Sequence, residues 1–211
     1  MKSDQPYLVP AGNGEALLVE KRSKFTARVW PVADEAEALL HISQTKETYW
    51  DATHNVYAYI IKDGPTRFSD DGEPHGTSGM PTLNVFKNNE IFNVCCVVTR
   101  YYGGVLLGAG GLVRAYSSAA KMALDAAGKC LMRLWDVVLL ACPYPLFEQM
   151  KLLVQSASGV VQSAEYGVDI MIEAMLPIDE TQSFLAGVQE LSSGQVEPEV
   201  IDTVFRGATV S

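Results

Sequence analysis

The sequence predicts an α+β protein of two consecutive domains, and three observations support that prediction. Strand-like and helix-like hydrophobic patterns alternate along the chain. A length of 211 residues is sufficient for two small domains that each have a core. A second series of strand and helix patterns starts near Trp135, so the boundary falls between Gly128 and Asp136. We therefore expect one domain over residues 1–133 and another over residues 134–211.

The first domain is expected to alternate strands and helices. Residues 15–30 predict one or two strands around a basic run, and residues 34–50 have helical spacing, with Asp34 and Glu35 suited to the first turn. The later elements are a strand over 56–61, a polar loop over 68–81, a short helix over 81–88, a strand over 91–99 and a helix over 112–127. The strand over 91–99 is apolar on both faces, so we expect it at the centre of its sheet.

The second domain is expected to follow the order β-α-β-β-α-β. The pattern consists of strands over 137–141, 160–166, 168–176 and 200–205, with helices over 146–156 and up to about residue 191. Asp179 is the expected cap of the second of these helices. This order is the ferredoxin-like pattern.

Composition excludes several classes of protein. No apolar run approaches the roughly 18 residues of a membrane span, and residues 1–10 lack the apolar segment of a secretory signal. The cysteines form no C-x-x-C pair; they are typical of buried thiols in a reducing compartment, and they predict neither a zinc site nor a disulfide-linked partner. We therefore expect a cytoplasmic protein that does not enter a membrane.

Charge is divided unequally between the two domains. Up to Arg133 the chain has 14 Lys+Arg and 14 Asp+Glu, a balance of 0, whereas from Leu134 onward it has 2 and 11, a balance of −9. Proteins that contact nucleic acid over a wide surface present a basic face, so only the first domain suits RNA. The acidic second domain either faces a basic protein partner or is kept soluble by its charge.

A glycine-dense turn before the helix over 112–127 is the first candidate site. It contains five glycines within nine residues and is bracketed by Arg100, Tyr101, Tyr102 and Arg114; the glycines are Gly103, Gly104, Gly108, Gly110 and Gly111. Glycine lets a ligand approach the backbone, and a helix N-terminus behind such a turn suits an anion. Arginine and tyrosine would add phosphate pairing and base stacking. The alternative is a tight strand-to-helix crossover in which the tyrosines pack on the sheet and Arg100 pairs with an acid such as Asp70 or Asp71.

An acidic loop is the second candidate site. Asp70, Asp71, Glu73 and His75 lie within six residues, and Asp51 and His54 precede them. Such a cluster could hold Mg²⁺ or Mn²⁺, or supply carboxylates with separated pKa values for acid-base chemistry. The alternative is that the aspartates form local turns and cap the helix that starts near residues 78–81, with Glu73 in solvent. His54 is then a hydrogen-bonded structural residue.

Three segments identify a family resemblance. DATHNVYAYI (51–60), FSDDGEPHGTSGMP (68–81) and TRYYGGVLLGAGGLVRAYSSA (99–119) resemble the Impact family, and the two-domain layout is similar to its bacterial YigZ-like branch. The resemblance implies a fold like domain 2 of ribosomal protein S5 for the first domain, followed by the ferredoxin-like domain. Together the pair resembles the last two domains of elongation factor G, which implies RNA and translation. Eukaryotic relatives regulate translation through an additional N-terminal domain, so their partner is not carried over to this chain.

Three functions follow as hypotheses. The first is a non-enzymatic protein that binds RNA or a ribosome-associated ribonucleoprotein through the first domain and regulates translation. The second is a metal-assisted enzyme that acts on a phosphorylated or anionic small molecule, and the third is an adaptor that binds a basic protein through the second domain. The chain has no G-x-S-x-G elbow and no phosphate-binding P-loop, which favours the first hypothesis and predicts no cofactor beyond an optional divalent metal.

Overall fold

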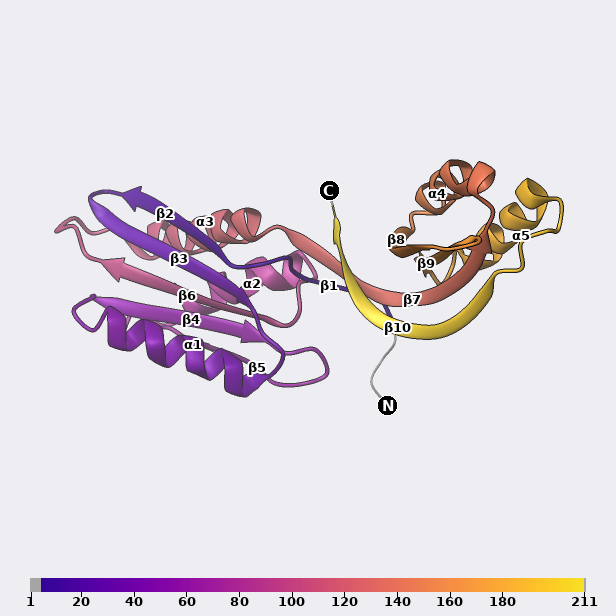
Figure 1. Cartoon of the computed structure of the whole chain (residues 1–211). Coiled ribbons are helices and arrows are strands. Elements are labelled where there is room, and N and C mark those ends of the chain that lie inside the picture. Colours follow the sequence, from indigo (N-terminus) through magenta and orange to yellow (C-terminus); the bar gives the residue numbers. More distant parts are fainter. Residues whose placement is uncertain (1–4, 211) are drawn as a thin grey trace. The chain divides into compact units, whose positions relative to one another are not determined.

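A computed structural model describes residues 5–210 and divides them into two compact units, shown in Figure 1. The first contains residues 7–131 and 208–210, and the second contains residues 5–6 and 132–207. The strand β7 (Lys129–Cys142) is continuous through the region where we place the domain boundary.

The first unit is built on one antiparallel sheet with the strand order β2-β3-β6-β4-β5. These strands are β2 (Gly14–Glu20), β3 (Ser23–Pro31), β4 (His54–Ile60), β5 (Thr66–Ser69) and β6 (Val94–Tyr101). As expected from its apolar residues on both faces, β6 lies at the centre, paired with β3 on one side and β4 on the other. Its last residues, Arg100 and Tyr101, therefore lie at the end of the central strand, in a register fixed by both neighbouring strands.

Helices cover both faces of this sheet, as Figure 1 shows. The helix α1 (Glu35–Thr48) packs on one face, and α2 (Gly79–Asn88) and α3 (Ala109–Ala127) pack on the other. Because successive strand residues point to opposite faces, Cys95 belongs to the core under α1 and Cys96 to the core under α2 and α3. Burial raises the pKa of the Cys95 thiol to about 12. All four cysteines are free.

The second unit has the predicted β-α-β-β-α-β order. It consists of β7, α4 (Phe147–Ser156), β8 (Val160–Tyr166), β9 (Ile170–Pro177), α5 (Thr181–Ser192) and β10 (Glu199–Val210), with a short 3₁₀ turn, η1 (Tyr144–Leu146), before α4. In its sheet β9 lies between β7 and β8, and β10 pairs with the other edge of β7. Buried Leu140, Met150, Ile172 and Phe184 join the sheet to both helices. The α+β class and the ferredoxin-like order are confirmed.

Four details differ from the sequence-based expectations. Two short strands were not expected: β1 (Tyr7–Pro10), and β5, which overlaps the start of the expected loop. The helix α3 begins at Ala109, three residues before the expected start, so Gly110 and Gly111 belong to its first turn. The residue before α5 is Glu180 rather than Asp179, and its side chain forms no capping hydrogen bond. Across residues 5–210, no helix has both the length and the apolar content that crossing a membrane would require.

Candidate functional site

The N-terminus of α3 is open toward solvent. Gly108 precedes the helix with a φ of 71°, which only glycine adopts without strain, and no side chain caps the helix. The first helical hydrogen bond runs from the Leu112 amide to the Gly108 carbonyl at 3.0 Å. The amides of Ala109 and Gly110 precede that bond, and the first turn contains no acidic residue. This end of the helix therefore presents amide donors and the positive end of the helix dipole without a counter-charge of its own.

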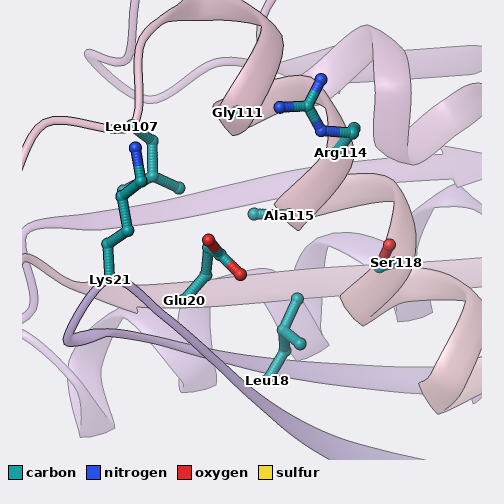
Figure 2. A pocket seen from close by; sticks show the side chains of 8 residues that line it. All are labelled: Leu18, Glu20, Lys21, Leu107, Gly111, Arg114, Ala115 and Ser118. Atoms are coloured by element: carbon teal, nitrogen blue, oxygen red, sulfur yellow. The ribbon is translucent and has the colours of Figure 1, made fainter.

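A hollow of about 240 Å³ on one side of this helix start has two basic side chains in its lining, Lys21 and Arg114, as Figure 2 shows. Arg114 is exposed, and its guanidinium extends back toward the first turn, 3.6 Å from where a Cβ on Gly110 would lie. Lys21 lies across the hollow from Arg114, and Glu20 contributes the acidic group of its lining. Within the described residues, the side chains of Lys21, Arg22 and Arg114 form no hydrogen bond or ion pair. We call these three residues the cationic set.

The turn that carries two members of the cationic set is strained. Lys21 and Arg22 connect β2 to β3 with φ angles of 45° and 66°, both in the left-handed region. A two-residue hairpin turn with two such angles is usually Asn-Gly, because other residues pay about 1–2 kcal/mol there. Selection for stability alone would favour Asn-Gly at these two positions, yet both hold exposed basic residues.

On the other side of the helix start, the acidic loop folds around its own aspartates. The Asp70 carboxylate accepts hydrogen bonds from Ser78 Oγ at 2.7 Å, the Gly79 amide at 2.8 Å and the Gly76 amide at 2.8 Å. Burial alone would raise the pKa of Asp70, but these hydrogen bonds outweigh it and lower the pKa. Asp70 therefore caps α2, although it lies eight residues before Ser78, the residue at the N-cap position of that helix. We expected the aspartates of this loop to cap that helix, and the structure shows this arrangement for Asp70.

Asp71 positions His54. Its carboxylate accepts from the Asn55 amide at 2.7 Å and pairs with Lys46 Nζ at 2.7 Å. Its carbonyl oxygen lies 2.8 Å from His54 Nδ1. Because a carbonyl oxygen can only accept, Nδ1 carries a proton, so whenever the imidazole is neutral Nε2 is left as an acceptor. His54 is thus held in one orientation and one tautomer.

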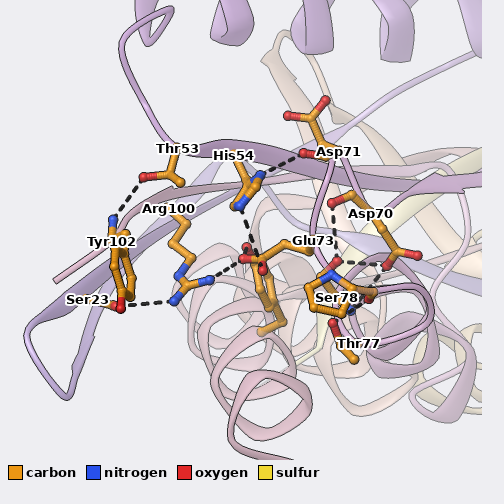
Figure 3. A network of polar contacts seen from close by, with 12 residues as sticks. Ser23, Thr53, His54, Asp70, Asp71, Glu73, Thr77, Ser78, Arg100 and Tyr102 are labelled. Carbon is orange, nitrogen blue, oxygen red and sulfur yellow. Dashed lines mark hydrogen bonds and ion pairs between the residues drawn. The ribbon is translucent and has the colours of Figure 1, made fainter. Parts of the chain in front are cut away.

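Glu73 is inserted into the interior, contrary to the expectation that it lies in solvent. Its side chain is 2% exposed, and its Oε1 accepts from Arg100 Nη1 at 2.6 Å and from the Tyr116 hydroxyl at 2.6 Å. Burial, followed by the hydrogen bond to Glu73, raises the pKa of Tyr116 far above its usual value. Its second oxygen, Oε2, lies 3.8 Å from His54 Nε2, and Figure 3 shows this arrangement. A loop residue thereby joins β4, β6 and α3.

Arg100 has a buried carboxylate partner, but that partner is Glu73. Neither Asp70 nor Asp71 pairs with it, because their carboxylates are bound to α2, Asn55 and Lys46. The guanidinium of Arg100 lies over the rings of Phe25 and Tyr102, 5.2 and 5.5 Å from their centroids. It also donates to Ser23 Oγ at 3.4 Å, while its buried Nε has no hydrogen-bond partner.

A cavity of about 370 Å³ connects this network to the start of α3. His54, Glu73 and Arg100 form its polar wall, and Gly108 and Ala109 form the helix-end wall. The remaining lining is mainly apolar and includes Tyr102, Leu106, Leu107 and Leu112. A volume of this size is at the lower end of the range for small-molecule sites, about 300–1,000 Å³.

The other predicted residues are placed elsewhere. Asp51 accepts a hydrogen bond from the Tyr101 hydroxyl at 2.8 Å, which also raises the pKa of that tyrosine. His75 is fully exposed, 3.7 Å from Asp70. In the part of the chain that the structure describes, no group of three or more His, Cys, Asp or Glu side chains is arranged to hold a metal ion. The six residues of the predicted acidic cluster therefore do not meet at one point: His54 lies beside Asp71 and Glu73, His75 lies near Asp70, and Asp51 pairs with Tyr101.

The glycines also have different roles. A Cβ on Gly103 would lie 2.1 Å from the backbone carbon of Arg22, so this glycine permits close packing, as the crossover interpretation requires. Gly104 and Gly108 have φ angles of 81° and 71° and open space around them. Only Gly108 belongs to the lining of the cavity.

Sequence reasoning missed Tyr116, Ser23 and Thr53. Tyr116 lies on the buried face of an alanine-rich helix, and a buried tyrosine hydroxyl normally needs a hydrogen-bond partner, which was an available signal. Ser23 is fully buried and binds both Arg100 Nη2 and the Gly103 amide. Nothing in the sequence points to Thr53, whose Oγ1 accepts from the Tyr102 amide at 3.0 Å.

Fold and site together define a class of two-domain α+β proteins, and comparisons identify the class. Residues 21–124 match the Impact N-terminal domain, and residues 140–195 match a domain of unknown function, DUF1949. The IMPACT family member YvyE of Bacillus subtilis is 33% identical over 90% of this chain and 88% of its own length. The IMPACT family member YigZ of Escherichia coli is 27% identical over 92% and 97%.

The chain therefore belongs to the IMPACT family, as the three sequence segments predicted. Protein IMPACT of Rattus norvegicus is 35% identical over 48% of this chain and 33% of its own length. A crystal structure of a hypothetical protein superposes with a TM-score of 0.58 at 27% identity, over 94% of this chain and 98% of that one. These similarities establish the two-domain fold.

Proposed function

We propose that the first domain binds RNA, free or in a ribonucleoprotein, and that this non-enzymatic protein regulates translation in the cytoplasm. The observation that carries the proposal is the cationic set. Lys21 and Arg22 occupy a strained turn and have no internal partner, and Arg114 lies across the hollow from Lys21, beside the start of α3. Unpaired guanidinium and ammonium groups beside open helix amides suit the phosphates of an RNA backbone.

The charge division supports the first domain as the binding unit. The nine excess negative charges of the sequence all lie beyond residue 133, which disfavours phosphate contact there. That acidic unit remains available for a basic protein partner.

A stabilising substitution tests the proposal. Replacing the turn with Lys21→Asn and Arg22→Gly introduces the residues that suit its left-handed angles, so we expect the melting temperature to rise. Binding of a labelled stem-loop RNA, measured by fluorescence anisotropy across a salt series, should nevertheless weaken. The slope of log affinity against log salt should fall by about 1 for each lost phosphate contact.

Two further variants complete this experiment. Arg114→Ala should also weaken RNA binding with little change in melting temperature. Lys151→Ala, in the second unit, removes a half-buried cation that pairs with Glu148 and should leave binding unchanged. Absence of RNA or ribosome binding at low salt, or equal affinity of the turn variant and the natural sequence, would refute the proposal. A pull-down from lysate with and without nuclease then distinguishes RNA from a protein partner.

A further inference from the structure

The cavity behind Glu73 contains two hydrogen-bond acceptors that no group of the described chain satisfies. Glu73 Oε2 accepts no hydrogen bond from the described residues, although the side chain is 2% exposed, and His54 Nε2 lies 3.8 Å from it. That distance is too long for a direct hydrogen bond. His54 cannot turn its protonated nitrogen toward Glu73, because Nδ1 donates to the Asp71 carbonyl at 2.8 Å. Neither atom is sealed from solvent, since the described side-chain N and O atoms that are both buried and without a partner are Arg100 Nε and Arg133 Nε. The two acceptors are therefore open to a donor from outside the chain, either water or a ligand.

One atom with at least two N–H groups fits between these acceptors. A donor placed between Nε2 and Oε2 can lie about 2.9 Å from each of them. A hydroxyl group has one hydrogen and can donate to only one acceptor, whereas an ammonium can donate to both. Because the charge of Glu73 is already paired with Arg100 at 2.6 Å, the ligand needs a negative group of its own to keep the site neutral.

The start of α3 also contributes to the lining of this cavity, and it suits that negative group. Gly108 and Ala109, at the open start of α3, line the same cavity. The helix has no capping side chain and no acidic residue in its first turn, so its amides are available to a carboxylate. The rest of the lining is mainly apolar and includes Leu106, Leu107, Leu112 and the ring of Tyr102. Such a surface suits an aliphatic group.

We propose that this cavity binds a small apolar α-amino acid, with its ammonium between His54 and Glu73 and its carboxylate at the start of α3. The site is separate from the cationic set, since Arg114 and Lys21 line a different hollow. Both proposals use the open start of α3, but the amino-acid site does not require the cationic set, so the inference goes beyond RNA binding.

Three related probes test the ligand class in the full-length protein. L-leucine has the ammonium, the carboxylate and an aliphatic tail; 2-hydroxy-4-methylpentanoate replaces the ammonium with a hydroxyl, and 4-methylpentanoate has neither. Isothermal titration calorimetry should rank their affinities in that order, with the last probe weaker than L-leucine by about tenfold or more. No binding of L-leucine at millimolar concentration, or equal binding of L-leucine and 4-methylpentanoate, would overturn the proposal.

Two variants test the placement. Glu73→Gln should weaken L-leucine binding by about tenfold or more, because a neutral amide replaces the carboxylate that accepts from the ligand's ammonium. If that variant does not fold, Ala109→Asp tests the placement instead. Its carboxylate at the start of α3 should stabilise the helix and occupy the proposed anion site. Ala109→Asp should keep or raise the melting temperature and abolish L-leucine binding. Ala126→Asp, at the other end of the same helix, is the matched control and should bind normally. L-leucine binding retained in Ala109→Asp would show that the carboxylate lies elsewhere.

Discussion

Two arginines that the sequence presents as a pair differ in their surroundings. Arg100 is buried, with Glu73 as its partner at 2.6 Å, whereas Arg114 is exposed and has no polar partner among residues 5–210. An arginine this close to the start of a helix suits either an external anion or an internal carboxylate that lies between the two. Its surroundings favour the external anion. The internal carboxylate belongs instead to Arg100, which is therefore part of the architecture of the first unit.

Substitution of each arginine should separate the two roles. Arg100→Ala leaves Glu73 as an unpaired buried charge, which should cost about 3–5 kcal/mol in the free energy of unfolding. Arg114→Ala should leave the urea midpoint nearly unchanged, because its exposed side chain has no hydrogen bond or ion pair within residues 5–210 to lose. Urea unfolding followed by circular dichroism measures both. A small loss for Arg100→Ala, or a large one for Arg114→Ala, would reverse the assignment.

At the scale of the element, α2 and α3 differ in how the unpaired amides at their N-termini are satisfied. The start of α2 is capped by Asp70 from an upstream loop, and the start of α3 has no cap. Sequence reasoning started α3 too late because glycine costs about 1 kcal/mol relative to alanine inside a helix. Packing outweighs that preference here, since a Cβ on Gly111 would lie 2.9 Å from the Leu107 Cβ. No local pattern reveals such a contact.

The cap of α2 should make stability depend on pH. The pKa of Asp70 is lowered from its ordinary value of 3.8 in the folded state, so its stabilising contribution is complete above pH 3.8 and is lost as the pH falls through the lower, folded-state pKa. Asp70→Asn keeps the shape of the side chain but removes its charge. We expect the natural protein to melt at a higher temperature than Asp70→Asn near neutral pH, by an amount that shrinks under acid conditions. A difference in melting temperature that is the same at neutral and strongly acidic pH would contradict this assignment.

At the scale of the whole molecule, the sequence predicted the fold better than the site. Long elements with clear periodicity, such as β6, α3 and the six elements of the second unit, were found because local pattern and tertiary packing agree. The strands β1 and β5 have four residues each, too few to show a period. Most residues of both candidate sites were named from their types, but Tyr116, Ser23 and Thr53 were missed and the pairing of the residues was not predicted. Glu73 meets Arg100 and Tyr116 across 27 and 43 residues of sequence, and such contacts follow from the register of the sheet.

The anchored loop over residues 70–78 has a consequence for how proteases attack the protein. Its composition and the full exposure of His75 resemble those of an easily nicked surface loop. A protease needs an extended stretch of backbone, however, and releasing this one requires removing Glu73 from Arg100 and Tyr116 and Asp70 from the start of α2. Cleavage there should therefore wait for unfolding of the whole first unit, at a rate that follows its global stability. Subtilisin digestion followed by mass spectrometry should find this loop intact in the native protein and cut early in Glu73→Gln; early cleavage in both would show that the loop opens independently.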